Sequence, residues 1–347
     1  MHRRTLMKSL IAAPLLGALG SQALAGASGA PARQLARRLQ PGMTVGLITP
    51  ASNAPENEDI RFAADVVRSL GFKVKESRHL YARNQYLAGT DAQRAADVND
   101  MFSDKSVDAI FCMRGGYGTP RILPLLDYKT IGKNPKVLLG YSDITALHNA
   151  IHQRTGLVTF HGPIAGQNFT DYTYAEFNKV MMQAQHPVAL GEAPPFDAAP
   201  GRVERDNRIT TFVGGRARGR LIGGNLTLIA SVMGTPFQPD FRDAILFLED
   251  VHEAPYRIDR MLTQLWLAGV FDQVAGVVLG KFTDAGTDGN TFSLEQVFEQ
   301  RFGQLKVPVV RGLMIGHVKD QTIVPVGGQA ELDGDSGRLT LTEAVLR

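Results

Sequence analysis

Short apolar runs alternate with helical stretches along the first half of this chain, and this alternation limits the fold more than any other feature. Residues 44–50, 72–76 and 107–113 have the composition of buried strands. Residues 58–70 and 91–102, which lie between them, carry apolar side chains at helical spacing. Strands that are separated by helices predict βαβ units and a parallel sheet. In such sheets, ligands bind beyond the carboxyl ends of the strands.

The length and composition of the chain predict two packed domains. The chain has 347 residues, of which 44% are hydrophobic and 20% charged, and this supports packed cores rather than disorder. We predict an N-terminal domain over residues 40–170, a linker over residues 171–208 and a C-terminal domain over residues 209–347. Four prolines between residues 187 and 200 interrupt regular structure in the linker.

The N-terminus has the pattern of an export signal. The pair Arg3-Arg4 precedes an apolar stretch that ends at Leu19, and Ala23-Leu24-Ala25 matches a small-residue cleavage site. We therefore predict a twin-arginine signal over residues 1–25, a tether over residues 26–39 and a location in the periplasm. The competing interpretation is an uncleaved N-terminal anchor.

Removal of this signal changes the charge of the chain. Residues 1–25 contain Arg3, Arg4 and Lys8 and no acidic residue, so their loss takes the formal net charge from +3 to 0. The remaining sequence contains no basic run of the kind that binds nucleic acid. The apolar stretch of the signal is too short to span a bilayer, and no later segment is long and apolar enough to do so. We therefore expect neither a nucleic-acid partner nor stable membrane insertion after cleavage.

Ser142 lies at a predicted corner between a strand and a helix. An apolar run that ends at Leu139 leads into Gly140-Tyr141-Ser142-Asp143, and a helical stretch follows to about Gln153. A serine at such a corner presents its hydroxyl group beside unpaired backbone amides at a helix N-terminus. This arrangement suits a nucleophile whose attack creates an oxyanion. The alternative is an N-cap serine, which is a common role for this residue type.

An acid and a histidine follow apolar strands in the second half of the chain. Glu249 comes after the run 245–248, and His317 comes after the run 313–316. A histidine can accept a serine proton near neutral pH, and a carboxylate fixes the tautomer of that histidine and stabilises the imidazolium. The order serine, acid, histidine is therefore compatible with nucleophilic catalysis. For each residue considered singly, the alternatives are a solvated glutamate and a loop histidine.

A glycine-rich turn and a pair of arginines are further candidates for binding. Gly115-Gly116-Tyr117-Gly118 could bring a backbone amide to an oxyanion, could cradle a phosphate, or could simply end a strand. The turn lacks the spacing of the two common phosphate-binding loops. Arg257 and Arg260 lie on a predicted helix over residues 257–267, where they could hold a substrate carboxylate or form surface ion pairs.

The histidines and the single cysteine do not form a recognisable metal motif. His148 and His152 are four residues apart and would share a helix face, with His161 nearby in the sequence. The zinc motif H-E-x-x-H is absent, because no glutamate follows His148. Cys112 lies in an apolar run, which favours a buried and unreactive thiol, and a single cysteine excludes an internal disulfide. We therefore predict no metal ligands.

Six short motifs occur in order along the chain. They are Arg114-Gly115-Gly116-Tyr117-Gly118, Gly140-Tyr141-Ser142-Asp143, Gly223-Gly224-Asn225-Leu226, Leu248-Glu249-Asp250, Tyr256-Arg257-Ile258-Asp259-Arg260 and Gly316-His317. From about Leu39 to the C-terminus, this series resembles the LD-carboxypeptidase family of serine peptidases, the muramoyltetrapeptide carboxypeptidases. The resemblance implies an α/β fold with two domains. It implies a Rossmann-like N-terminal domain resembling class I glutamine amidotransferases and a mixed α/β C-terminal domain.

The resemblance also implies a serine mechanism that uses neither a metal nor a cofactor. The implied catalytic triad consists of Ser142, Glu249 and His317. Backbone amides near Gly116 and Asp143 are implied to form the oxyanion hole. Asn225, in the third motif, joins Arg257 and Arg260 as a candidate for binding the substrate. Members of the family are often dimers, so a homodimer is an assembly that the resemblance allows.

The usual reaction of the family cleaves the bond between an L-centre, typically of meso-diaminopimelate, and the terminal D-alanine of a murein tetrapeptide. Many members recycle imported muropeptides in the cytoplasm, so the export signal predicted for this chain departs from that role. Related proteins hydrolyse peptidyl-nucleotide antibiotics of the microcin C type, which need an aromatic platform for a base that we do not identify in this sequence. A non-catalytic periplasmic binding protein is a further alternative, because two α/β domains around a cleft also describe solute receptors.

Overall fold

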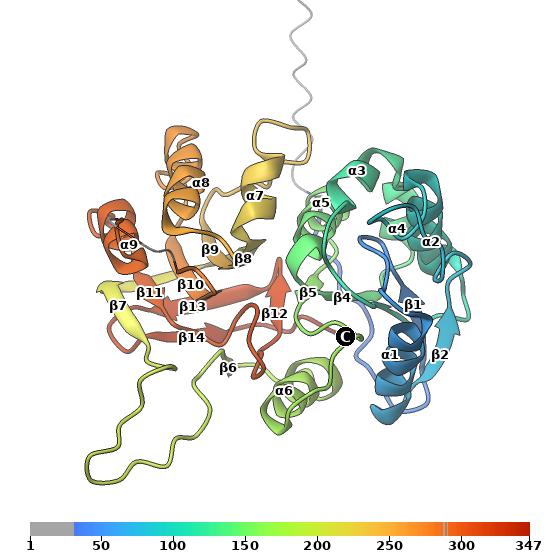
Figure 1. Cartoon of the computed structure of the whole chain (residues 1–347), viewed down its shortest axis with the longest axis horizontal. Coiled ribbons are helices and arrows are strands. Elements are labelled where there is room, and N and C mark those ends of the chain that lie inside the picture. Colours follow the sequence, from blue (N-terminus) through green and yellow to red (C-terminus); the bar gives the residue numbers. More distant parts are fainter. Residues whose placement is uncertain (1–30, 287–288, 290) are drawn as a thin grey trace, which may run out of the picture.

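A computed structural model describes residues 31–286, 289 and 291–347 of the chain. The predicted export signal and residues 26–30 of the predicted tether lie outside the described residues. Two α/β lobes lie side by side, each built on its own sheet, as Figure 1 shows. Within the described part of the chain, no helix is long and apolar enough to cross a membrane.

The first lobe is built on a six-stranded sheet with the order β12-β5-β4-β3-β1-β2. Its strands are β1 (Thr44–Ile48), β2 (Lys73–Glu76), β3 (Ala109–Cys112), β4 (Val137–Gly140), β5 (Thr159–His161) and β12 (Val324–Val326). The strands from β2 to β5 are parallel to their neighbours, whereas β12 runs antiparallel to β5. The parallel sheet predicted from the alternation of strands and helices is confirmed.

Helices cover both faces of this sheet (Figure 1). They are α1 (Asn57–Ser69), α2 (Asp91–Ser103), α3 (Thr119–Ile122), α4 (Tyr128–Lys133), α5 (Thr145–Thr155) and α6 (Asp171–Phe177), with 3-10 turns at Leu123–Leu125 and Ser142–Ile144. A capping box begins α2, because the Thr90 side chain accepts from the backbone N–H of Gln93 while the Gln93 side chain accepts from that of Thr90. Such a cap stabilises a helix by about 1 kcal/mol.

The second lobe is built on an eight-stranded mixed sheet with the order β6-β14-β13-β8-β9-β10-β11-β7. Its strands are β6 (Val188–Leu190), β7 (Thr210–Val213), β8 (Arg216–Asn225), β9 (Ala244–Val251), β10 (Gly276–Thr283), β11 (Val309–Arg311), β13 (Gln329–Asp333) and β14 (Arg338–Leu341). In Figure 1, helices α7 (Leu226–Val232), α8 (Pro255–Leu267) and α9 (Leu294–Phe302) lie on one side of the sheet. Strands β8 to β11 are parallel, so their carboxyl ends meet at one edge. The two-domain α/β fold class is confirmed.

The predicted domain boundaries do not include two features of the structure: regular elements within the predicted linker, and a late strand that belongs to the first lobe. The predicted linker contains α6, a π-helical turn at Asn178–Met182 and strand β6, which pairs with β14. Strand β12 comes late in the chain but pairs with β5 of the first lobe. The described part of the predicted tether packs on the body, where Gln34 and Ala36 form β-bridges and Leu39 is buried. All these partners are distant in the sequence, so local composition could not reveal them.

Candidate active site

Ser142 occupies the turn between β4 and α5, at the carboxyl end of its strand. Its backbone has φ = 64°, in the left-handed region, which costs a non-glycine residue about 1–2 kcal/mol. Gly115 leaves room for this turn, because a Cβ atom at that position would lie 3.0 Å from Ser142 Cβ and 3.2 Å from its Oγ. Within the described residues, the Ser142 hydroxyl group caps neither the 3-10 turn nor α5. The N-cap interpretation therefore does not hold, and the hydroxyl group is free for another role.

Glu249 and His317 lie close together near the carboxyl ends of the parallel strands β8 to β11 of the second sheet. Glu249 lies on β9 and is completely buried, and its Oε2 is 2.7 Å from Nδ1 of His317. This hydrogen bond assigns the proton of the neutral imidazole to Nδ1 and leaves Nε2 able to accept another proton. Gly316, with φ = 111°, makes the approach possible, since a Cβ atom there would lie 2.7 Å from Glu249 Oε2.

Tyr141 connects the serine turn to the histidine across the two lobes. Its ring lies 4.7 Å from the His317 ring, measured between centroids. Tyr141 and His317 also line one cavity of about 420 Å³, so Ser142 follows directly after a residue that faces the histidine. In the described part of the chain, no hydrogen bond joins Ser142 to His317. Such bonds are often long in unliganded sites and shorten when a ligand binds.

His161 is a further polar residue of this site, which the sequence indicated only as a metal candidate. It ends β5 and is completely buried, and its Nε2 lies 3.9 Å from Glu249 Oε1. Burial lowers the pKa of His161 well below its usual value, so the ring is neutral. Because the His161 ring is neutral, it packs against the Glu249 carboxylate without forming an ion pair that would weaken the interaction of Glu249 with His317. The signal in the sequence was a polar residue directly after an apolar strand, which Glu249 and His317 also show.

The other two histidines of the candidate metal set bond to the backbone. His148 Nε2 lies 2.8 Å from the carbonyl oxygen of Gly140, and His152 Nδ1 lies 3.1 Å from that of Leu157. Among the described residues, no group of three or more histidines, cysteines and acidic residues is arranged to hold a metal ion. His148 therefore has a structural explanation, since it supports the strand end that leads into Ser142.

We expect the burial of His148 to make the chain sensitive to acid. Burial lowers the pKa of His148 from 6.5 to about 4, because the charged form loses its solvation. As the pH falls through this interval, the unfolded chain takes up a proton that the folded chain does not, so the free energy of unfolding falls. The slope is about 1.4 kcal/mol per pH unit for one such group.

Urea unfolding at about pH 7 and about pH 5 measures this loss. Between these two pH values, the free energy of unfolding of His148→Gln should fall by about 1–2 kcal/mol less than that of the wild type, because glutamine does not titrate. His186→Gln, at an exposed position, is the matched control and should lose as much as the wild type. Equal losses in the wild type and in His148→Gln would contradict the expectation.

Two backbone amides beside Ser142 are free to donate. Within the described residues, the N–H groups of Gly116 and Asp143 make no hydrogen bond. Gly116 has φ = 111° and lies against Ser52, so close that a Cβ atom would be 2.5 Å from Ser52 Oγ. The Asp143 carboxylate accepts from the backbone N–H of Thr119 at 2.8 Å, which ties the glycine turn to the start of the helix. The arrangement can therefore present two fixed donors to an anion.

Asn225, which we predicted to bind the substrate, makes several contacts within the protein. Its Nδ2 donates to Asp250 at 3.1 Å, its Oδ1 accepts from the N–H of Leu228 at 3.3 Å, and the whole residue is 3% exposed. Its backbone N–H donates to Thr145 Oγ1 at 2.9 Å. Burial, with a further contribution from the charge of Glu249, raises the pKa of Asp250 to about 6. Asn225 thus joins the helix after the serine turn to the strand that carries Glu249.

Arg257 and Arg260 lie on the exposed side of α8 and do not line the cavity beside His317. Arg257 donates to the Tyr256 hydroxyl at 3.1 Å and lies 3.6 Å from Glu253. The Arg260 guanidinium packs over the Tyr256 ring, 5.4 Å from its centroid. These contacts fit the surface interpretation of the two arginines, and the structure does not place them as a clamp at the site.

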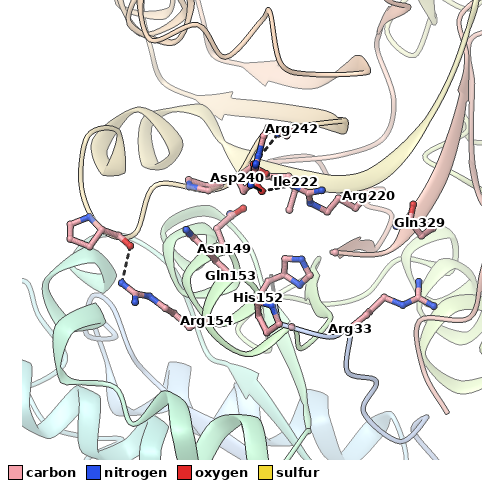
Figure 2. A pocket seen from close by; sticks show the side chains of 15 residues that line it. Arg33, Asn149, His152, Gln153, Arg154, Arg220, Ile222, Asp240, Arg242 and Gln329 are labelled. Carbon is pink, nitrogen blue, oxygen red and sulfur yellow. Dashed lines mark hydrogen bonds and ion pairs between the residues drawn. The ribbon is translucent and has the colours of Figure 1, made fainter. Parts of the chain in front are cut away.

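A separate cavity of about 630 Å³ lies near the other end of α5 (Figure 2). Two of its arginines, Arg220 and Arg242, share the carboxylate of Asp240 at 3.2 and 2.9 Å. Gln153 lines this cavity. At the helical rise of about 1.5 Å per residue, Gln153 lies about 16 Å from Ser142 along the helix axis. The cavity is therefore distinct from the site that contains the serine turn.

Comparison with known proteins assigns the chain to a family. A model of the LD-carboxypeptidase N-terminal domain matches residues 45–162, and a model of the LD-carboxypeptidase C-terminal domain matches residues 218–332. The probable murein peptide carboxypeptidase of Bacillus subtilis is 38% identical to this chain over 86% of this chain and 91% of its own length.

Solved structures are also similar to this chain. Muramoyltetrapeptide carboxypeptidase from Oxalobacter formigenes is 30% identical with a TM-score of 0.74, and the match covers 87% of this chain and 99% of that one. MccF in complex with glutamyl sulfamoyl guanosine is 27% identical with a TM-score of 0.81, over 90% of this chain and 99% of that one.

The family models include the residues described above. Ser142 lies within the first match, and Glu249 and His317 lie within the second. Together the two models cover more than half of the chain, and the relationship predicted from the six motifs is confirmed. On this evidence from sequence and structure, the chain belongs to the LD-carboxypeptidase family.

Proposed function

We propose that this protein is a serine LD-carboxypeptidase that removes the terminal D-alanine of a murein tetrapeptide from an L-centre, typically of meso-diaminopimelate. The observation that carries the proposal is the 2.7 Å contact between the buried Glu249 and the half-buried His317, at the lobe junction that also contains the strained turn of Ser142. The names of the similar proteins, a probable murein peptide carboxypeptidase and a muramoyltetrapeptide carboxypeptidase, support this substrate.

In the proposed reaction, Ser142 Oγ attacks the carbonyl carbon of the scissile amide while His317 Nε2 takes the hydroxyl proton. The N–H groups of Gly116 and Asp143 stabilise the oxyanion, and the Glu249 carboxylate stabilises the imidazolium. His317 then gives its proton to the nitrogen of D-alanine as the amide C–N bond breaks, which leaves an acyl-serine. A water molecule loses a proton to the same imidazole and attacks the ester, which releases the shortened peptide and restores the serine.

Purified muropeptides with a tetrapeptide stem test the proposal. Incubation with the protein should release one alanine, which mass spectrometry detects as a shortened stem. A tetrapeptide that ends in L-alanine is the matched control and should remain intact. A fluorophosphonate probe separates catalysis from binding, because only an activated serine is labelled. An unlabelled protein that binds muropeptides without cleaving them would instead be a receptor.

The likeness to MccF, at a TM-score of 0.81, favours a second candidate function. In that case the same serine chemistry would cleave a peptidyl-nucleotide conjugate of the microcin C type rather than a murein peptide. The two substrates differ in the group beyond the scissile bond. The ratio of kcat/KM for the tetrapeptide to that for glutamyl sulfamoyl guanosine decides between the candidates, and we expect it to favour the tetrapeptide.

We expect Gly116→Pro to lower kcat by about 10² or more, because proline removes one of the two oxyanion donors. The substitution should have less effect on KM, since the oxyanion exists only after attack. Gly116→Ala is the matched control: it strains the same turn but keeps the N–H group, so it should retain more activity. Steady-state kinetics on the tetrapeptide gives both constants. A larger change in KM than in kcat would show that the turn binds substrate instead.

A homodimer is the assembly that we propose, because members of the family often form one. Sedimentation velocity over a range of protein concentrations measures the oligomeric state. A single species with the mass of one chain at all concentrations would contradict it.

We also propose that the folded protein reaches the periplasm through the twin-arginine pathway. The pair Arg3-Arg4, the short apolar stretch and Ala23-Leu24-Ala25 support this route. Fractionation of cells that express the full chain should yield a soluble periplasmic product beginning at Gly26. Changing Arg3 and Arg4 together to lysine should stop its export. A cytoplasmic product that retains residues 1–25 would overturn the proposal and favour the recycling role.

A further inference from the structure

The peptide group between Gly115 and Gly116 decides where one of the proposed oxyanion donors points. A peptide group is planar and trans, so its C=O and N–H bonds point in opposite directions. Both residues are glycines, which adopt either sign of φ without a steric penalty, so this peptide can rotate more easily than its neighbours. A rotated peptide would turn the Gly115 carbonyl oxygen toward the oxyanion in place of the Gly116 N–H. The proposed mechanism therefore needs a contact that holds this peptide in one orientation.

Ser52 binds the chain on both sides of Gly116. Its backbone N–H donates to the carbonyl oxygen of Gly115 at 3.4 Å, and its Oγ accepts from the backbone N–H of Tyr117 at 3.0 Å. The first of these bonds is long, whereas the second has the usual length for an N–H donor and an oxygen acceptor. A Cβ atom at Gly116 would lie 2.5 Å from Ser52 Oγ, so the hydroxyl group packs directly against this glycine. Because the Gly115 carbonyl points toward Ser52, the Gly116 N–H points to the opposite side.

The loop that carries Ser52 is itself fixed to the glycine turn by a buried arginine. Arg94 is completely buried, and its Nη1 donates to the carbonyl oxygen of Pro50 at 2.7 Å and to that of Gly118 at 2.9 Å. Ser52 also forms a β-bridge with Leu87. The backbone of the loop is therefore held by contacts that do not involve the Ser52 hydroxyl group. Replacement of this side chain should remove one contact to the turn without releasing the loop.

We propose that Ser52 is a positioning residue that keeps the peptide between Gly115 and Gly116 turned with its N–H toward the oxyanion. The inference rests on the proposed serine mechanism and deepens it, because it names the contact that prepares one of the two donors. The turn lies against the nucleophile, since a Cβ atom at Gly115 would be 3.0 Å from Ser142 Cβ. A donor that is already aligned stabilises the developing negative charge without reorganisation, whereas a donor that must first rotate loses part of this effect.

Ser52→Ala should lower kcat for the murein tetrapeptide about tenfold to a hundredfold, because a small displacement of an aligned group has an effect of this size on the reacting centre. KM should change less, since the oxyanion exists only after attack and substrate binding does not need the aligned N–H. Ser52→Thr keeps the hydroxyl group and should retain most of the wild-type kcat. Steady-state kinetics gives both constants. A wild-type kcat in Ser52→Ala, or a larger change in KM than in kcat, would contradict the positioning role.

Two further variants separate positioning from a general effect on the fold. Ser293→Ala is the matched control, because Ser293 Oγ accepts from the backbone N–H of Gln296 at 3.2 Å at the start of α9, so its loss should lower Tm and leave kcat unchanged. Ser52→Ala combined with Gly116→Pro tests the route of the effect. Once proline has removed the N–H, loss of the Ser52 hydroxyl group should lower kcat little further. Decreases that multiply in the double variant would show that Ser52 acts by another route.

A fluorophosphonate probe tests the inference without a peptide substrate. Ser142 Oγ bonds to the phosphorus as fluoride leaves and His317 takes the hydroxyl proton, and the negative charge on the phosphoryl oxygen needs the same donors. Ser52→Ala should be labelled about tenfold more slowly than the wild type, and Ser293→Ala at the wild-type rate. If the wild type is labelled but cleaves no tetrapeptide, the proposed substrate fails and the labelling rates still decide the role of Ser52. Equal rates in the wild type and Ser52→Ala would overturn that role, and a wild type that is neither labelled nor active would overturn both proposals.

Discussion

Ser142→Ala should release at most a trace of D-alanine from the murein tetrapeptide, while its circular dichroism spectrum and Tm stay close to those of the wild type. The serine oxygen forms the covalent bond to the substrate, so its removal should lower kcat by roughly 10⁴–10⁶. His317→Ala should lose a similar factor, because the members of a triad act as a unit. The fold should survive, since the Ser142 hydroxyl makes no hydrogen bond within the described residues that its removal would break.

Two further variants make this result specific. Ser231→Ala removes the hydroxyl group of an exposed serine and should keep full activity. Ser142→Gly should be as inactive as Ser142→Ala but more stable, because glycine adopts the left-handed backbone of this turn without strain. Turnover at the wild-type level in Ser142→Ala would remove the serine from the mechanism.

Glu249→Gln should lower kcat by roughly 10²–10⁴ and leave KM much less changed. Glutamine has nearly the same shape, but it cannot stabilise a positive imidazolium and can hold the His317 ring in the wrong tautomer. The effect should be large because Glu249 is completely buried and its Oε2 is 2.7 Å from the imidazole, where water cannot take its place. Steady-state kinetics on the tetrapeptide, with Tm measured in parallel, separates this effect from loss of the fold.

Glu331→Gln provides the comparison for Glu249→Gln. Glu331 lies on β13 of the same sheet and pairs with the exposed Arg218, so its loss should change neither kcat nor KM. If Glu249→Gln kept more than about a tenth of the wild-type kcat, the carboxylate would only position the loop of Gly316 and His317, and the proposed triad would reduce to a pair.

Local patterns in the sequence were sufficient for most of the first lobe. The helix predicted over residues 91–102 forms at Asp91–Ser103, and the strand predicted over residues 107–113 forms at Ala109–Cys112. The linker over residues 171–208 was harder to predict, because β6 is a three-residue strand that exists only through its pairing with β14. Short strands of this kind carry little periodicity, and their partners in the sheet decide whether they form.

The sequence by itself determined that Ser142, Glu249 and His317 each follow an apolar strand, and the order of the six motifs determined the family. Only the tertiary structure decided that Glu249 reaches Nδ1 of His317 and that His161 lies behind the carboxylate. Periodicity reports the face on which a side chain lies within its own strand, whereas the distance between strands depends on sheet order and on the space left by glycines such as Gly316. For the same reason, the arginines that a local pattern favoured lie on an outer helix and do not line the cavity that contains His317.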